Sequence, residues 1–327
     1  MNKSKFLFIF LGLFGVSLLA QENALIKIMQ SELNRSFNGL KNAGKEPLYF
    51  LQYEIIDEEE IIITAFNGAI LENEHSKNRY LTVDVRIGSY KLDNTHQIRG
   101  ASGFGGGDFY GESYEPISLE NDEFSIREIL WKKTDEEFKK GQERIMKIKS
   151  EKETKVAELD TSPDFSKSVP EVYLEPETKL LIDTAQWAIR LKELSKIFKE
   201  YPWIFSSSVG LRARVTTKYL VNTDGAKIID NKTYYLNRAT ASTKAEDGMA
   251  LYLSRPVYAH SSELLPSDKE IKSTVNTLIG DLAALRKAPL VDPYSGPAIL
   301  KNQAASVFFH EIFGHRIEGH RQKLERE

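Results

Sequence analysis

Three residues near the carboxyl end of the chain have the types that metal-dependent hydrolysis requires. His310, Glu311 and His315 form a His-Glu-x-x-x-His pattern, and His320 follows, so that three of the six histidines lie within eleven positions. A zinc hydrolase uses two neutral imidazoles as metal ligands, a carboxylate that takes a proton from water, and one open coordination position. His310, His315 and Glu311 match those residue types.

The spacing of the two histidines is unusual for a regular α-helix. In the common His-Glu-x-x-His pattern the histidines are four residues apart, about 40° around the helix, whereas a separation of five residues gives about 140°. A single π-type turn would reduce that offset to roughly 50°, and Gly314 is where the backbone could yield. The apolar residues before His310 and the charged tail from Arg321 predict a helix whose early part is buried. Surface histidines on an amphipathic helix are the alternative interpretation.

The elements before this motif are predicted from the periodicity of apolar residues. Helical spacing from Leu25 to Leu40 indicates an amphipathic first helix, and alternation with a period of two then indicates strands at 48–56, 61–65 and 81–87. Six glycines at 100–111 do not complete a phosphate-binding spacing, and they predict a mobile loop.

The second half of this region alternates helices and strands. A long charged helix is expected at about 128–160, with a thin apolar seam that is either a solvated face or an arm for a partner chain. A helix at about 177–200 follows, and then strands between 203 and 260 with a hairpin turn at 222–225. Ser267 and Glu270 form a capping box that predicts a helix at 268–287.

Composition excludes several classes of protein. The 327 residues are 41% hydrophobic, which is enough for about two domains with cores of their own. The net charge of −3 gives no basic surplus, so we expect no nucleic-acid partner. The sequence contains no cysteine, which excludes disulfides, thiolate ligands and thiol nucleophiles among these residues.

The amino terminus has the pattern of an export signal. Lys3 and Lys5 precede a 15-residue apolar run at 6–20, and Ala20 offers a cleavage point. A membrane-spanning helix needs about 20 apolar residues, so an uncleaved anchor is the weaker alternative. We expect residues 1–20 to be removed and the mature protein to be periplasmic or secreted, without a stable membrane span.

The motif and its surroundings resemble the TldD/PmbA family of bacterial metallopeptidases. In that family the His-Glu-x-x-x-His motif is followed closely by a Glu-Gly pair, which Glu318 and Gly319 match. The Asp-Pro-Tyr-Ser-Gly-Pro segment at 292–297, the Val-Asn-Thr-Asp-Gly segment at 221–225 and the order of the first helix and its strands are also similar. His320 departs from the acidic residue that the family usually has after the pair.

The resemblance implies a fold, a cofactor and roles for the site residues. His310 and His315 would be Zn²⁺ ligands and Glu311 the catalytic base, with the third ligand a cysteine beyond residue 327, in a large β-rich carboxyl-terminal domain. The implied fold class is α+β: an amino-terminal region at 21–288 with antiparallel strands and the long charged helix, and then the start of the metallopeptidase domain at 289–327. The family forms dimers, of like or unlike chains, that enclose a chamber and cleave peptides or unfolded protein segments.

Three other interpretations remain open at this point. The chain could be a non-catalytic partner subunit of the same fold, although His310, Glu311 and His315 argue against that. It could be another peptidase with this motif and a glutamate as third ligand, which the strand-rich sequence before the motif fits poorly. It could also be an exported binding module whose histidines are incidental.

Overall fold

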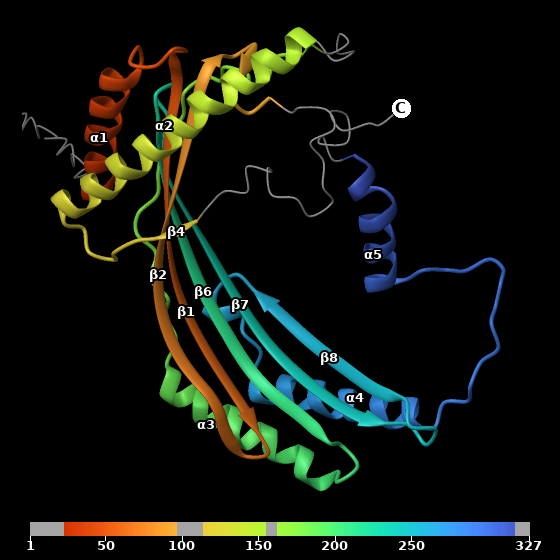
Figure 1. Cartoon of the computed structure of the whole chain (residues 1–327). Coiled ribbons are helices and arrows are strands. Elements are labelled where there is room, and N and C mark those ends of the chain that lie inside the picture. Colours follow the sequence, from red (N-terminus) through yellow and green to blue (C-terminus); the bar gives the residue numbers. More distant parts are fainter. Residues whose placement is uncertain (1–22, 97–113, 155–161, 318–327) are drawn as a thin grey trace, which may run out of the picture.

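A long antiparallel sheet forms the centre of the protein (Figure 1). The structure is a computed structural model, and it describes residues 23–96, 114–154 and 162–317. Eight strands follow the order β3-β2-β1-β6-β7-β5, with β4 also paired to β2 and β8 to β7, and only β5 runs parallel to its neighbour. The strands are β1 (Leu48–Phe66), β2 (Ala69–Ser89), β3 (Leu92–Asp93), β4 (Glu115–Pro116), β5 (Val172–Leu174), β6 (Ser206–Asn222), β7 (Lys227–Lys244) and β8 (Ala250–Ala259). The predicted α+β class is confirmed.

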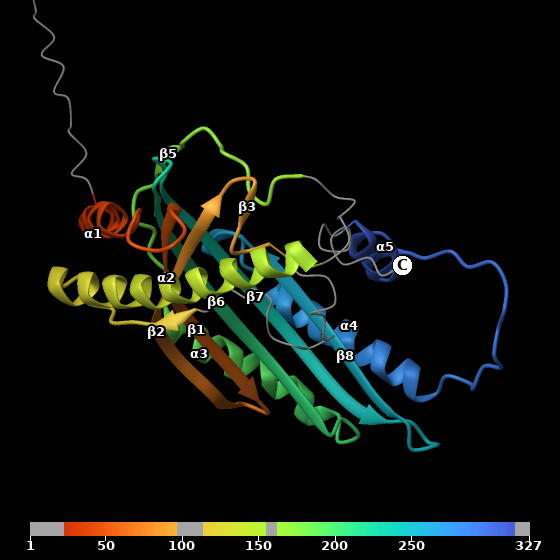
Figure 2. The same ribbon diagram turned by 45° about the horizontal axis from the view of Figure 1, so that its top comes forward.

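Four helices cover the two ends of this sheet (Figures 1 and 2). Near one end lie α1 (Ala24–Leu40) and α2 (Glu123–Thr154), and near the other lie α3 (Thr184–Ser195) and α4 (Asp268–Arg286). Short 3₁₀ turns occur at Lys196–Glu200 and Ser262–Leu264. Each helix pair closes its own apolar cluster against the strands, one around Met29 and Tyr53 and the other around Ile63 and Leu278. The long strands therefore connect two separate cores.

The strand β1 corrects the prediction of separate strands at 48–56 and 61–65. The residues 48–56 and 61–65 are one continuous strand, because the acidic run at 57–60 between them also stays in the sheet. Glu60 is 9% exposed and pairs with arginines of β6, and Asp57 pairs with Arg79 of β2. Cross-strand partners thus allow charged residues to occupy the middle of a 19-residue strand.

The long charged helix begins earlier than predicted, at Glu123, and its described part ends at Thr154. Phe138, Ile145 and Ile148 of the expected seam are buried, and the helix packs within the same chain against β2 and α1. Lys139 and Lys140 on the other side are exposed. This arrangement favours the solvated-helix interpretation over an arm for a partner chain. Residues 155–160 of the predicted helix lie outside the described residues.

The prediction of a helix from residue 177 was wrong at its amino end. The helix α3 begins at Thr184, because the carboxylate of Asp183 accepts a hydrogen bond from the amide of Gln186 at 2.9 Å and caps the first turn. By contrast, the predicted helix at 268–287 is confirmed as α4, with both hydrogen bonds of the Ser267 and Glu270 capping box present.

Several expectations concern segments that the structure does not describe. The export signal at 1–20 and the glycine-rich segment at 100–111 lie outside the described residues. Among the residues that are described, no helix combines the length and apolar character needed to cross a membrane.

Candidate metal centre

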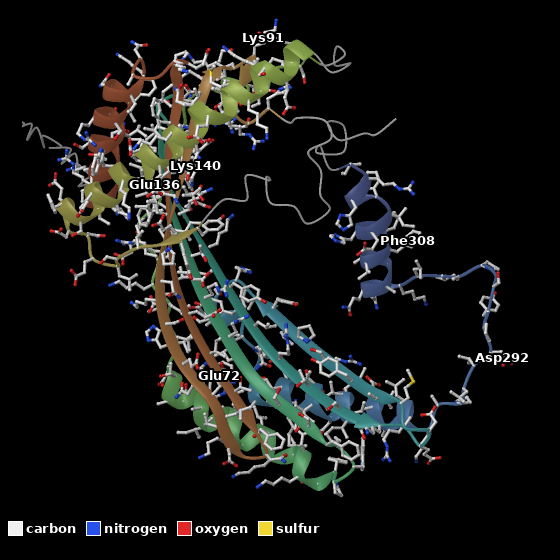
Figure 3. The ribbon with its side chains drawn as sticks, in the orientation of Figure 1. Glu72, Lys91, Glu136, Lys140, Asp292 and Phe308 are labelled. Atoms are coloured by element: carbon white, nitrogen blue, oxygen red, sulfur yellow. The ribbon has the colours of Figure 1, made fainter. Side chains whose placement is uncertain are left out.

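The motif lies on a short helix and on the turn that follows it. The helix α5 (Asn302–Ile312) ends where the amide of Phe313 donates to the carbonyl of Phe309 at 3.0 Å, and a 3₁₀ turn, Gly314–Arg316, comes next. A segment at 287–301 without helix or strand connects α5 to α4, and Figure 1 shows α5 standing apart from the sheet. Asp292, on that connection, and Phe308, on α5, are labelled in Figure 3.

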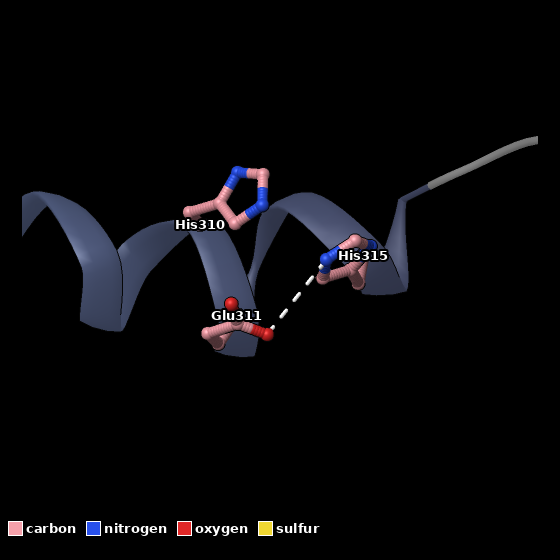
Figure 4. Close-up of side chains that lie close together, drawn as sticks. All are labelled: His310, Glu311 and His315. Atoms are coloured by element: carbon pink, nitrogen blue, oxygen red, sulfur yellow. Dashed lines mark ion pairs between the residues drawn. The ribbon is translucent and has the colours of Figure 1, made fainter.

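The two histidines approach each other despite their separation of five residues (Figure 4). Their ring centroids are 4.7 Å apart, with an angle of 71° between the ring planes. Glu311 completes the group: an oxygen of its carboxylate lies 3.7 Å from Nε2 of His315, and one ligand atom from each of the three residues lies within 4.8 Å of the others. The structure therefore brings together all three residues that the sequence singled out.

The backbone achieves this approach without the π-type turn that the spacing of the histidines suggests. The helical hydrogen bonding changes just before Gly314, as expected, but the chain tightens into a 3₁₀ turn, with the amide of Arg316 donating to the carbonyl of Phe313 at 3.0 Å. A Cβ atom added at Gly314 would lie 3.9 Å from Nδ1 of His310. The 3₁₀ turn thus carries His315 back beside His310, and the distance at Gly314 is an ordinary van der Waals contact, so an added methyl group there would not clash with the imidazole.

The site is open to solvent, which corrects the prediction of a buried helix start. No residue of α5 is buried in the described part of the chain, and the side chains of Glu311 and His315 are 61% and 42% exposed. Large apolar side chains are exposed on the same segment: Val307, Phe308, Phe309, Ile312, Phe313 and Ile317. The apolar run predicts a buried face, but no described element packs against it closely enough to bury it.

The donor atoms suit zinc. Two imidazoles and a carboxylate are a common set for this ion, and metal–ligand bonds of about 2.0–2.2 Å place two ligand atoms on one ion within about 4.4 Å of each other. One ligand atom from each of His310, Glu311 and His315 lies within 4.8 Å of the others, which is close to that limit. Since a catalytic site keeps the carboxylate as a base, the two histidines would hold the ion and a further ligand would complete the site. His320 lies outside the described residues.

Sequence reasoning missed a second cluster of titratable residues, at the end of the sheet near α1 and α2. Asp93 and Asp164 have side chains that are 0% and 2% exposed, and Nδ1 of His96 lies 2.6 Å from Asp164. The hydroxyl of Tyr49 donates to Asp93 at 2.5 Å. Burial and, to a smaller extent, the Asp93 carboxylate raise the pKa of Tyr49. The cluster ties the chain near His96 to the chain near Asp164, and this spacing of 68 residues gives no local sequence signal.

Comparison with known proteins gives partial structural likenesses to several solved structures. No family model matches the chain, and no curated protein matches its sequence. A candidate modulator of a DNA gyrase from Thermotoga maritima is 10% identical with a TM-score of 0.42, covering 76% of this chain and 47% of its own. A candidate modulator of DNA gyrase from Bacteroides thetaiotaomicron is 10% identical with a TM-score of 0.45, covering 76% and 49%. TldE from Thermococcus kodakarensis is 8% identical with a TM-score of 0.42, covering 80% and 47%. The chain thus spans about half the length of the solved structures it matches.

Proposed function

We propose that this chain contributes the histidine ligands and the base of a zinc-dependent peptidase of the TldD/PmbA type. The observation that carries the proposal is the convergence of His310, Glu311 and His315 within 4.8 Å, on a motif whose sequence has the order of such a site. The resemblance of the flanking segments at 221–225 and 292–297 to that family supports it.

The roles of the three residues follow from their chemistry. His310 and His315 hold the ion through their imidazole nitrogens, in the neutral form. The ion supplies Lewis acidity for a peptide carbonyl and for water. Glu311 accepts the proton of the attacking water on its carboxylate, and it delivers that proton to the leaving amine. The exposure of Glu311 leaves room for a peptide to approach it.

The complete site needs a ligand that these residues do not supply. By the resemblance, this ligand is a cysteine in a β-rich segment beyond residue 327, and residues 1–327 contain no cysteine. Two ligands leave an ion mostly hydrated, so residues 1–327 alone are proposed to bind zinc weakly.

The cellular location of the enzyme and its substrate class are part of the same proposal. Residues 1–20 direct export, so the enzyme acts outside the cytoplasm on exported peptides or damaged proteins. Two subunits enclose the site, which selects extended chains over folded ones, because an extended chain can pair its backbone with a strand edge.

The test uses the full-length protein with bound zinc. Cleavage of a folded protein is compared with cleavage of the same protein unfolded, before and after zinc is removed with a chelator and restored. We expect cleavage of the unfolded form only, lost with zinc and recovered with it. Activity that is unchanged after zinc removal would contradict a role for zinc in catalysis. If no peptide is hydrolysed, the result would favour a non-catalytic subunit or a binding module.

A further inference from the structure

A trough lies on the face of the sheet opposite α3 and α4. Side chains alternate between the two faces of a strand, and the odd-numbered Ile63, Val209 and Ala239 are buried in the core under these helices. The trough opens on the even-numbered face and has a volume of about 320 Å³. It is lined by four neighbouring strands, with side chains that include Ile62, Thr64, Glu72, Arg212, Leu236 and Arg238.

One row of paired residues crosses the trough from strand to strand. Glu72 of β2 pairs with Thr64 of β1, Thr64 with Gly210 of β6, and Gly210 with Arg238 of β7. Neighbouring strands are about 4.8 Å apart, so the backbones at the two ends of the row are about 14 Å apart. Glu72, labelled in Figure 3, lies at one end and Arg238 at the other. The row therefore has opposite charges at its two ends.

The charge at the Arg238 end is not matched within the described part of the chain. Arg212, in the next row, pairs with Glu60 at 2.9 Å, whereas the guanidinium of Arg238 has neither a hydrogen bond nor an ion pair among the described residues. At the other end, Glu72 accepts one hydrogen bond, from the hydroxyl of Thr64 at 3.2 Å, which leaves carboxylate lone pairs for another donor. Both ends can thus take a ligand group of opposite charge.

The middle of the row has no side chain to fill the trough, because Gly210 lies there. A Cβ atom at Gly210 would point into the trough, 3.3 Å from Oγ1 of Thr64 and 3.2 Å from the carbonyl of Ile63. Glycine weakens a strand interior and often marks a place where a ligand approaches the backbone closely. The hydroxyls of Ser208 and Thr240, 2.8 Å apart, line the trough beside Arg238 and can bond a ligand amide.

We propose that this trough binds a short peptide with free termini, with its carboxylate on Arg238 and its ammonium group on Glu72. A guanidinium recognises a carboxylate through two parallel hydrogen bonds. An extended peptide of three or four residues spans roughly 10–14 Å, which fits the row. A phosphate dianion fits less well, because the acid at Glu72 balances the arginine. This deepens the proposed peptidase function, on which its role as a substrate or product subsite rests, but binding itself requires no zinc.

The experiment measures peptide affinity by titration calorimetry on full-length protein carrying Glu311→Gln, so that the probe is not hydrolysed. The probes are tetra-alanine, its carboxyl-terminal amide, its amino-acetylated form, acetate and inorganic phosphate. We expect free tetra-alanine to bind about tenfold more tightly than either blocked form, and acetate and phosphate to bind at least as weakly as the blocked peptides.

Variants assign the two ends of the trough. Arg238→Gln should weaken binding of tetra-alanine about tenfold and remove the difference in affinity between the free peptide and its amide. Glu72→Gln should also weaken binding of tetra-alanine about tenfold, and it should remove the difference in affinity between the free peptide and its acetylated form. Gly210→Val should block peptide binding, because the valine side chain would fill the middle of the trough. Arg255→Gln is the matched control, because that arginine lies on neighbouring β8 and pairs with Asp281 at 2.6 Å.

Two results would overturn the proposal. One is equal affinity for the free and blocked peptides, or no peptide binding at millimolar concentration. This result counts when the variants unfold at the same temperature as the parent protein, which shows that they are folded. The other is phosphate binding as tightly as tetra-alanine, which would mean a simple anion site. Because peptide binding is measured without hydrolysis, failure of the peptidase proposal can be distinguished from failure of the peptide-binding proposal.

Discussion

The imidazole rings of His310 and His315 lie 4.7 Å apart although five residues of regular α-helix would turn them to different sides. The end of α5 at Ile312 and the 3₁₀ turn after it make this approach possible. A pair of imidazoles held so closely is suited to share one ion.

The first prediction concerns these two ligands. His310→Ala and His315→Ala should each lower the zinc content of the full-length protein from about one ion per subunit to well below half, because one histidine leaves the ion too few ligands. Elemental analysis of purified protein measures this. His75→Ala is the control, since His75 is on β2, 2.7 Å from Glu59, and that variant should keep its zinc. Parent-level zinc in both motif variants would remove these histidines from the site.

The second prediction concerns Glu311. Glu311→Gln should keep zinc and stability but slow peptide hydrolysis by roughly 10²–10⁴-fold, because an amide cannot accept the proton of water. Turnover numbers and zinc content are measured on the same preparation. Glu318→Gln, seven residues further along, serves as the comparison and separates loss of a base from loss of negative charge near the motif. Undiminished turnover in the Glu311 variant would exclude it as the base.

The sequence was sufficient for elements whose signals are local. The capping box of Ser267 and Glu270 fixes the start of α4 through hydrogen bonds that span three residues. The hairpin between β6 and β7 is likewise local: the amide of Gly225 donates to Asn222 at 3.1 Å, and its φ of 101° is a conformation that glycine adopts readily. Such signals need no knowledge of distant residues.

The sequence was insufficient where distant partners decide the structure. The acidic run at 57–60 resembles a loop until Arg79 and Arg214, which are far away in sequence, are placed beside it. The trough between Glu72 and Arg238 also depends on the register of four strands, which periodicity alone does not give. For the metal group, residue types predicted the members, but the turn that brings them together was not predicted.

The third prediction concerns the pairing of Asp57 with Arg79 in the middle of the long hairpin. The guanidinium donates to both carboxylate oxygens, at 2.5 and 2.6 Å, and its side chain is only 4% exposed. Asp57→Ala should lower the free energy of unfolding by about 3 kcal/mol, because it leaves a buried charge without its partner. Arg79→Met should cost less, since the remaining carboxylate is 28% exposed and can be hydrated.

Urea unfolding of the two single variants and the double variant measures the third prediction. The double variant should be more stable than the sum of the single effects implies, because removal of both partners leaves no buried charge. Asp135→Ala, which breaks an exposed pair with Lys139 on α2, is the control and should change stability by less than about 1 kcal/mol. An Asp57→Ala effect as small as this control would show that the pair contributes nothing.

The fourth prediction is a dependence of stability on pH that arises from Glu32. Its side chain is 1% exposed on α1. Burial, the largest influence, raises the pKa of this carboxyl, but hydrogen bonds from Arg35, Ser36 and Arg127 together outweigh it and hold the pKa below its ordinary value. A carboxyl with a depressed pKa in the folded state stabilises the protein above the unfolded pKa of about 4.3, and this stability is lost as the pH falls through the folded-state value.

Glu32→Gln should therefore destabilise the protein at pH 7 by about 1.5–3 kcal/mol, the range for hydrogen bonds to a charged group. The difference between parent and variant should shrink as the pH falls from about 5 through the depressed pKa, because the parent carboxyl becomes protonated and neutral there as well. Thermal unfolding of both proteins between pH 7 and pH 3 measures that difference. Glu128→Gln, an exposed position on α2, is the control and should follow the parent at every pH. A difference between the Glu32 variant and the parent that stays constant over this range would mean that the carboxylate contributes through packing, with no part played by its charge.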